Sequence, residues 1–155
     1  LTGEYVFNTL PYPLLSLHLG NESFLYTSLT YNLMNYGEFV SDHFASVQYR
    51  QYLEGFLLNR VPLLNKLKWR LLATGNVIMG GMRQSNRDLI ATETADGTPT
   101  LPVGYFTNGK PYVELGYGVE NIFRFLRVDF IHRLSYLDNE NARKFGVLFT
   151  AQIQL

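Results

Sequence analysis

The C-terminal end of the chain alternates apolar and polar side chains from residue 144 to residue 155. One set of alternate positions is apolar throughout: Phe145, Val147, Phe149, Ala151, Ile153 and Leu155. The positions between them are Lys144, Gly146, Thr150, Gln152 and Gln154, with Leu148 as the exception. Successive side chains of a strand point to opposite faces, so the pattern predicts a strand with one apolar and one polar face. This strand would exceed the usual five or six residues and approach the roughly 9–11 residues that cross a bilayer at a tilt.

The composition is compatible with a membrane protein and excludes several other classes. Basic and acidic residues number 13 each, so the net charge of zero gives no support to a nucleic-acid partner. Charged residues make up 17% of the chain, below the roughly 25% of soluble domains, while aromatic residues reach 15%. Many tyrosines with few charges suit a lipid–water boundary, although a tyrosine-rich soluble β protein fits the composition equally well. The absence of cysteine excludes disulfides and thiolate metal sites.

Alternation of period two recurs along the rest of the chain. It covers residues 25–33, 45–53, 69–79, 113–119 and 126–136, and a shorter piece spans residues 4–9. We therefore predict about seven strands, no helix and an all-β fold, namely an antiparallel up-and-down transmembrane β-barrel. No secretory signal peptide precedes Leu1. We expect residues 1–155 to be a C-terminal fragment of one barrel domain whose N-terminal remainder is missing.

The connections between the predicted strands differ in length. Residues 82–110 form a long polar loop rich in glycine and proline, and residues 55–67 form an apolar and basic connector. If the last strand runs towards the periplasm, the loop at residues 82–110 lies on the extracellular side. The connector at residues 55–67 then lies on the periplasmic side. Bacterial barrels place their long loops outside.

The charges decide which face of such a barrel meets lipid. An arginine at the bilayer midplane costs about 2–4 kcal/mol, so Arg127 and Arg133 must face the lumen. A shift of one residue would turn both outward. On the last strand, the residues predicted to face lipid are then Phe145, Val147, Phe149, Ala151 and Ile153. Alternation alone also fits a soluble lipid-binding barrel with its apolar face inward.

A charged patch is the most suggestive polar group. Glu114 on one strand and Arg127, Asp129 and Arg133 on the next are expected on the lumen face. The patch could bind a plug, a loop or a passing substrate. The alternative, which we favour, is a network of charges that neutralise one another.

The sequence gives little support for a metal site, a phosphate-binding loop or a nucleophilic serine. His18, His43 and His132 are scattered, with no ligand spacing, so we expect no metal site. The Gly116-Tyr117-Gly118 stretch lacks the third glycine and the helix of a phosphate loop, and it more simply marks a close backbone contact in a curved sheet. No serine lies in a nucleophile elbow. We expect neither a cofactor nor an enzyme activity.

Three long stretches, residues 32–42, 55–70 and 111–129, resemble a known family. They are similar to the C-terminal barrel region of the Bacteroidota outer-membrane proteins that carry an N-terminal carboxypeptidase-like regulatory domain. Residues 118–134 and 145–155 are also similar, more distantly, to the last two strands of the outer-membrane assembly-factor (surface antigen) superfamily. The resemblance implies a location in the outer membrane, a barrel of on the order of sixteen strands and no enzyme activity. Barrels of this kind usually end in an aromatic residue, and here the last residue is Leu155.

Two functions follow from the resemblance and one from the pattern alone. The first is a structural or transport barrel, with a role like that of an assembly factor in inserting or translocating polypeptides. The second is a nutrient-uptake receptor or porin, and the third is the soluble lipid-binding barrel. The expected partners of the first are outer-membrane lipid, the barrel-assembly machinery and the missing N-terminal strands of the same protein.

Overall fold

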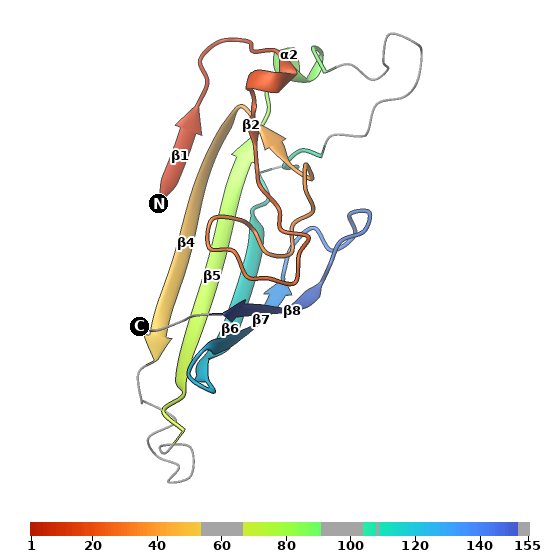
Figure 1. The fold of residues 1–155 in the computed structure, drawn as a ribbon. Coiled ribbons are helices and arrows are strands. Elements are labelled where there is room, and N and C mark those ends of the chain that lie inside the picture. Colours follow the sequence, from red (N-terminus) through yellow and green to blue (C-terminus); the bar gives the residue numbers. More distant parts are fainter. Residues whose placement is uncertain (54–66, 91–103, 108, 152–155) are drawn as a thin grey trace.

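The main element of the computed structural model is a six-stranded antiparallel sheet (Figure 1). The structure describes residues 1–53, 67–90, 104–107 and 109–151. In order across the sheet, the strands are β1 (Thr2–Tyr5), β4 (His43–Leu53), β5 (Arg70–Gly81), β6 (Tyr112–Ile122), β7 (Leu126–Arg133) and β8 (Phe145–Ala151). Strands β4 to β8 follow one another in chain order, which is an up-and-down arrangement. The predicted all-β antiparallel class is confirmed.

Most of the long alternating stretches form the long strands of the sheet. Strands β4 and β5 pair without interruption from His43↔Gly81 to Leu53↔Leu71. Strands β6 and β7 are joined by a tight link in which Phe123 and Arg124 adopt positive φ angles. Residues 55–66 of the predicted connector lie outside the described residues, as do residues 91–103 and 108 of the loop predicted at residues 82–110.

The strand predicted at residues 25–33 is wrong, because this stretch consists of turns and single bridges. The side chain of Asn32 accepts a hydrogen bond from the Thr27 N–H (3.1 Å) and donates one to the Thr27 carbonyl oxygen (3.1 Å). Asn21 similarly accepts from the Ser23 N–H at 2.9 Å. The asparagine side chains thus form the hydrogen bonds that a neighbouring strand would otherwise form with this backbone. They stabilise turns that reverse the direction of the chain.

These turns belong to an inner segment, residues 15–42, which lies against one face of the sheet in front of β5 and β6 (Figure 1). The segment begins and ends with a short ladder, β2 (Ser16–Leu17) and β3 (Val40–Ser41). Before it stands a 3₁₀ turn, η1 (Tyr12–Leu14), and a short helix, α2 (Gln84–Arg87), follows β5. We call the covered face the inner face and the opposite one the outer face.

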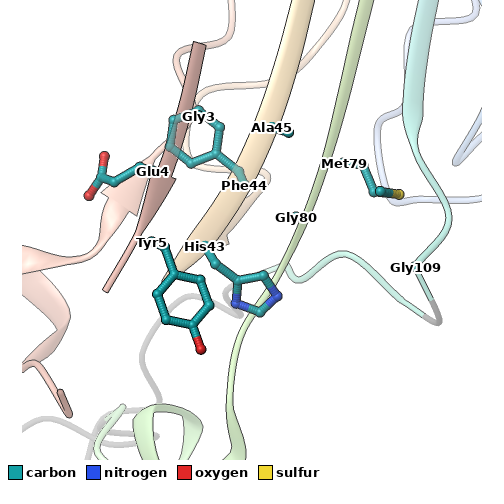
Figure 2. Close-up of a pocket in the computed structure, with 9 residues that line it drawn as sticks. All are labelled: Gly3, Glu4, Tyr5, His43, Phe44, Ala45, Met79, Gly80 and Gly109. Carbon is teal, nitrogen blue, oxygen red and sulfur yellow. The ribbon is translucent and has the colours of Figure 1, made fainter. Parts of the chain in front are cut away.

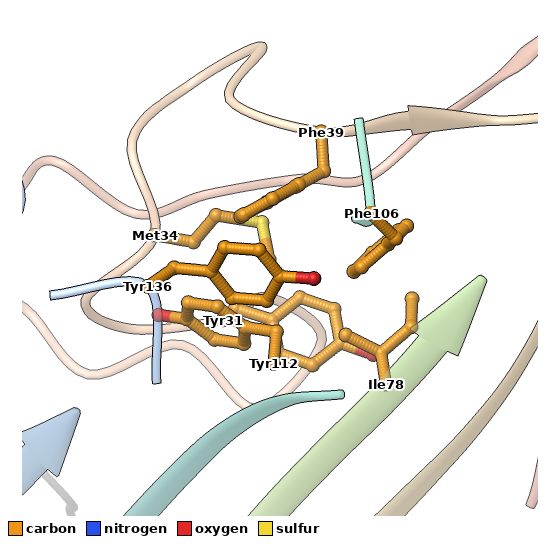
Figure 3. Packing of buried hydrophobic residues seen from close by; sticks show 7 residues of the cluster. All are labelled: Tyr31, Met34, Phe39, Ile78, Phe106, Tyr112 and Tyr136. Carbon is orange, nitrogen blue, oxygen red and sulfur yellow. The ribbon is translucent and has the colours of Figure 1, made fainter. Parts of the chain in front are cut away.

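The apolar core lies between the inner segment and the sheet. Figure 3 shows its largest cluster, formed by Tyr31, Met34, Phe39, Ile78, Phe106, Tyr112 and Tyr136. Phe39 stacks on Phe106 with ring centroids 4.7 Å apart, and both rings are almost fully buried. Aromatic side chains from the segment, the sheet and the loops therefore hold the segment in place.

The inner segment also explains the exceptions to the alternation. Leu148 and Ile131 are apolar residues at polar positions, and both are buried against Leu33. A Cβ at position 146 would lie 2.6 Å from the Leu33 side chain, so Gly146 leaves the space that Leu33 occupies. These positions are apolar or small because the segment covers them.

Candidate functional site: the charged inner face

Glu114 on β6 binds the inner segment directly. Its carboxylate accepts the backbone N–H groups of Asn32 (3.0 Å) and Leu33 (2.6 Å). It also accepts the Tyr112 hydroxyl at 2.5 Å and the Asn76 amide at 3.3 Å. Glu114 is 1% exposed, and a buried carboxylate is stable only when donors surround it. The side chain is therefore an anchor for the segment.

Arg133 on β7 holds a second point of the same segment. Its guanidinium donates to both carboxylate oxygens of Glu38, at 2.9 and 2.5 Å. It also donates to the carbonyl oxygens of Ser135 (3.0 Å) and Tyr136 (2.7 Å). Burial by itself raises the pKa of Glu38, but hydrogen bonds from Arg133 and other donors outweigh it and leave this pKa below its ordinary value.

Arg127 and Asp129 form a separate pair. They are two residues apart on the inner face of β7 and share two hydrogen bonds of 2.7 Å. Both side chains are at most 2% exposed. The guanidinium also lies 4.5 Å from the centroid of the Tyr26 ring, which belongs to the inner segment. A Cβ at position 118 would lie 2.7 Å from an Asp129 oxygen, which agrees with the close contact predicted for this glycine.

The structure therefore places all four residues of the predicted patch on the inner face but does not join them in one network. Glu114 and Arg133 are register partners, yet each binds the inner segment instead of the other. Among the described residues, the charges are satisfied by a loop of the same chain and by one another.

Sequence reasoning missed the partners of the patch. Asn32, Glu38, Tyr26 and Tyr112 complete its hydrogen bonds and stacking contacts, and the first three lie in the inner segment. The density of asparagine and glycine in residues 20–37 was the available signal, because these residues favour turns.

A second buried carboxylate, Asp42, closes the end of the inner segment. It accepts from the Arg83 backbone N–H (3.0 Å), the Arg83 guanidinium (3.2 Å), the Asn86 amide (2.5 Å) and the His43 ring (2.5 Å). Burial opposes ionisation of this side chain, but these donors lower the pKa of Asp42. Arg83 also donates to the carbonyl oxygens of residues 6–8. Asp42 and Arg83 thereby link the inner segment, α2 and the chain after β1.

The outer face is apolar and exposed. On β8, Phe145, Val147 and Phe149 are 50%, 37% and 38% exposed, and Ala151 is also exposed. Ile153 lies outside the described residues. Further exposed side chains on this face are Val47, Tyr49, Met79, Leu115 and Tyr117. Tyr117 stacks on Phe130 with centroids 5.4 Å apart, so the rings form a continuous apolar surface across strands.

The free edge of β8 contacts the inner segment at one residue. The Phe149 N–H donates to the Phe24 carbonyl oxygen, and the Tyr26 N–H donates to the Phe149 carbonyl oxygen, both at 2.9 Å. These groups point away from β7, which pairs with the other edge. The edge of β8 can therefore accept an extended segment.

Figure 2 shows a hollow beside the sheet, about 560 Å³, where Tyr5, His43, Phe44 and Met79 surround small residues of β1, β4 and β5. A smaller hollow, about 230 Å³, lies between the inner segment and strands β4 and β5. No group of three metal-ligating side chains is found in the described part of the chain. Within the same ranges, no helix is both long and apolar enough to span a membrane.

Comparison of the chain with protein-family models, with curated proteins and with solved structures gave no match. The geometry of the two faces is therefore the basis for any functional assignment.

Proposed function

We propose that the chain forms the C-terminal part of an outer-membrane β-barrel with a structural or transport role. One observation carries this proposal, namely that the exposed face of the sheet is apolar, whereas the buried face carries charged side chains beside its apolar clusters. On β7 the buried side chains are Arg127, Asp129, Ile131 and Arg133, whereas Val128 and Phe130 lie on the more exposed face. Soluble sheets have the opposite arrangement, since burial favours apolar side chains.

The soluble lipid-binding barrel is the weaker alternative. Such a barrel holds its ligand in an apolar interior. Here the largest fully buried side chain is Arg127, and Glu114 is fully buried as well. The exposed outer side chains would also leave a water-facing apolar surface larger than soluble monomers usually carry.

In the proposed barrel, the outer face contacts lipid and the inner segment lies in the lumen. Strands β4, β5 and β6 have 11, 12 and 11 residues, which is sufficient to cross a bilayer at a tilt. The inner segment enters and leaves at the end of the sheet where β4 begins. It would narrow the lumen in the manner of a loop folded inward from one rim.

The test is the behaviour of the full-length protein in membranes. We expect the protein to stay in the membrane fraction after extraction with alkaline carbonate and to require detergent for a monodisperse preparation. A protein that is monodisperse without detergent would overturn the proposal.

A role in the insertion of polypeptides is a second candidate, and the edge of β8 favours it. Phe149 already pairs there with an extended part of the inner segment, so the same edge could pair with another strand. Deleting the gene separates the two roles. Loss of other outer-membrane barrels would support polypeptide insertion, whereas unchanged barrels with reduced solute uptake would support transport.

A further inference from the structure

The smaller hollow has a polar lining on the inner face. Its wall consists of Tyr26 and Ser28 from the inner segment, Gln48, Tyr49 and Arg50 from β4, and Asn76 from β5. Gln48, Arg50 and Asn76 occupy inner-face positions, because they alternate with the outward Val47, Tyr49 and Val77. The hollow is therefore built jointly by the sheet and the segment.

Arg50 gives this hollow a positive charge, and among the described residues it forms no ion pair, although its charge acts on the buried Asp129 carboxylate from a distance. In the described residues, the arginine–carboxylate ion pairs join Arg83 to Asp42, Arg127 to Asp129 and Arg133 to Glu38. Arg50 instead donates to the Tyr26 hydroxyl at 2.8 Å, and its guanidinium lies 5.2 Å from the Tyr26 ring centroid. Arg50 lines the hollow and is exposed to solvent.

The surroundings fix the position of Arg50. The guanidinium of Arg127 also lies over the Tyr26 ring, 4.5 Å from the ring centroid. The Tyr26 backbone is tied to Phe149 on β8. Because the ring is held from two sides, the Tyr26 hydroxyl restricts the positions of the Arg50 head group. A charged group that is held in advance loses less entropy when it binds a ligand.

Two neutral side chains, Ser28 and Gln48, line the hollow beside Arg50. Both are exposed, so the Ser28 hydroxyl and the Gln48 amide are accessible to a ligand. We propose that this hollow binds the oxyanion of a small solute, a carboxylate or a phosphate. In this assignment Arg50 supplies the charge, while Ser28 and Gln48 supply neutral hydrogen bonds. A guanidinium suits such groups because its N–H donors match two oxygens at once.

The inference rests on the proposed function in one respect, since solutes reach the inner face only if that face lines the lumen. Its test is a titration of the full-length protein with inorganic phosphate at constant ionic strength, followed by calorimetry. We expect Arg50→Gln to weaken phosphate binding about ten- to a hundred-fold, the scale of a hydrogen bond to a charged group. Ser28→Ala should weaken it a few-fold.

The matched control is Arg70→Gln, which removes the same charge from β5. Position 70 is four residues along β5 from Thr74, the register partner of Arg50, or about 13 Å, so phosphate binding should change little. Absence of binding to the natural protein, or an equal loss in both arginine variants, would overturn the inference. If Arg50→Gln does not fold, Ser28→Ala and Gln48→Leu take its place, and unchanged binding in both would overturn it. A protein that is monodisperse without detergent would instead count against the membrane barrel, and the titration would still report on the hollow.

Discussion

The two faces of the sheet differ in polarity and burial, and strand β7 shows this difference within eight residues. Its inner positions hold Arg127, Asp129 and Arg133, each almost fully buried and each bonded to a partner of opposite charge. Its outer positions hold Val128, Phe130 and His132, which are partly exposed, and the two rings contact neighbouring aromatic side chains on the same face. The inner face is ordered by specific pairs, whereas the outer face needs only an apolar environment.

This difference predicts how each face tolerates change. A buried charge is costly unless its partner is present, so single substitutions on the inner face should act through the partner left behind. On the outer face, a change of polarity should matter and a change of shape should matter little. Four experiments test this difference between the faces, in order of decreasing expected effect.

The largest effect is expected for Arg133→Met. The change leaves Glu38 buried without its guanidinium and removes the donor to the Ser135 and Tyr136 carbonyls. We expect the free energy of unfolding to fall by about 3–5 kcal/mol, as measured by urea denaturation in detergent. The double variant Arg133→Met/Glu38→Gln should recover part of the loss. A single-variant loss below about 1 kcal/mol would mean that the pair is unimportant.

Neighbouring positions on β4 compare the faces directly. Val47 is 47% exposed on the outer face, and Gln48 is exposed on the inner face. In a membrane, Val47→Arg should cost about 2–4 kcal/mol and reduce the amount of folded barrel, whereas Gln48→Arg should be tolerated. The measurement is the fraction of full-length protein that shows a heat-dependent shift in gel mobility. Equal yields of the two variants would contradict the assignment of faces.

Acid should weaken the inner segment through His18. The ring is buried, bonds to the Ser41 hydroxyl at 2.7 Å and packs between Phe44 and Phe106. Burial lowers the pKa of His18 from 6.5 to about 4. Between these values the unfolded chain binds the extra proton, so stability is full above pH 6.5 and falls as the pH drops towards 4. The loss should total about 3 kcal/mol.

Urea midpoints measured from pH 7 to pH 4 test this slope. His18→Gln should remove the part of the slope that lies between pH 6.5 and the acid range where Glu38 and Asp42 titrate. If the variant and the natural protein have the same slope, His18 is not the group responsible.

The smallest effect is expected for Tyr117→Leu on the outer face. The change removes the stack on Phe130 but keeps an apolar side chain, so it should cost about 1 kcal/mol. The control is Tyr36→Leu, since Tyr36 is 67% exposed on the inner segment. A loss as large as that of Arg133→Met would show that the outer face also depends on specific pairs.

Much of the sheet could be predicted from local pattern. Period two located β4 to β8 and placed Arg127 and Arg133 on one face of β7. The prediction failed at residues 25–33, because the same alternation occurs where Asn21 and Asn32 bond to the backbone and form turns. Alternation shows which side chains could share a face of a strand. It does not show which groups form hydrogen bonds with the backbone N–H and C=O groups.

By itself, the sequence determined the strands and the polarity of their two faces, because both depend on neighbours along the chain. Only the tertiary structure decided what covers the charged face. Glu114 meets Asn32 and Leu33 across more than 80 positions, and Arg133 meets Glu38 across 95. Such contacts depend on how the inner segment folds back onto the sheet, and no local period encodes that path. The alternation of residues 145–151 thus identifies a strand with two unlike faces, and the segment packed against it explains why Leu148 breaks the pattern.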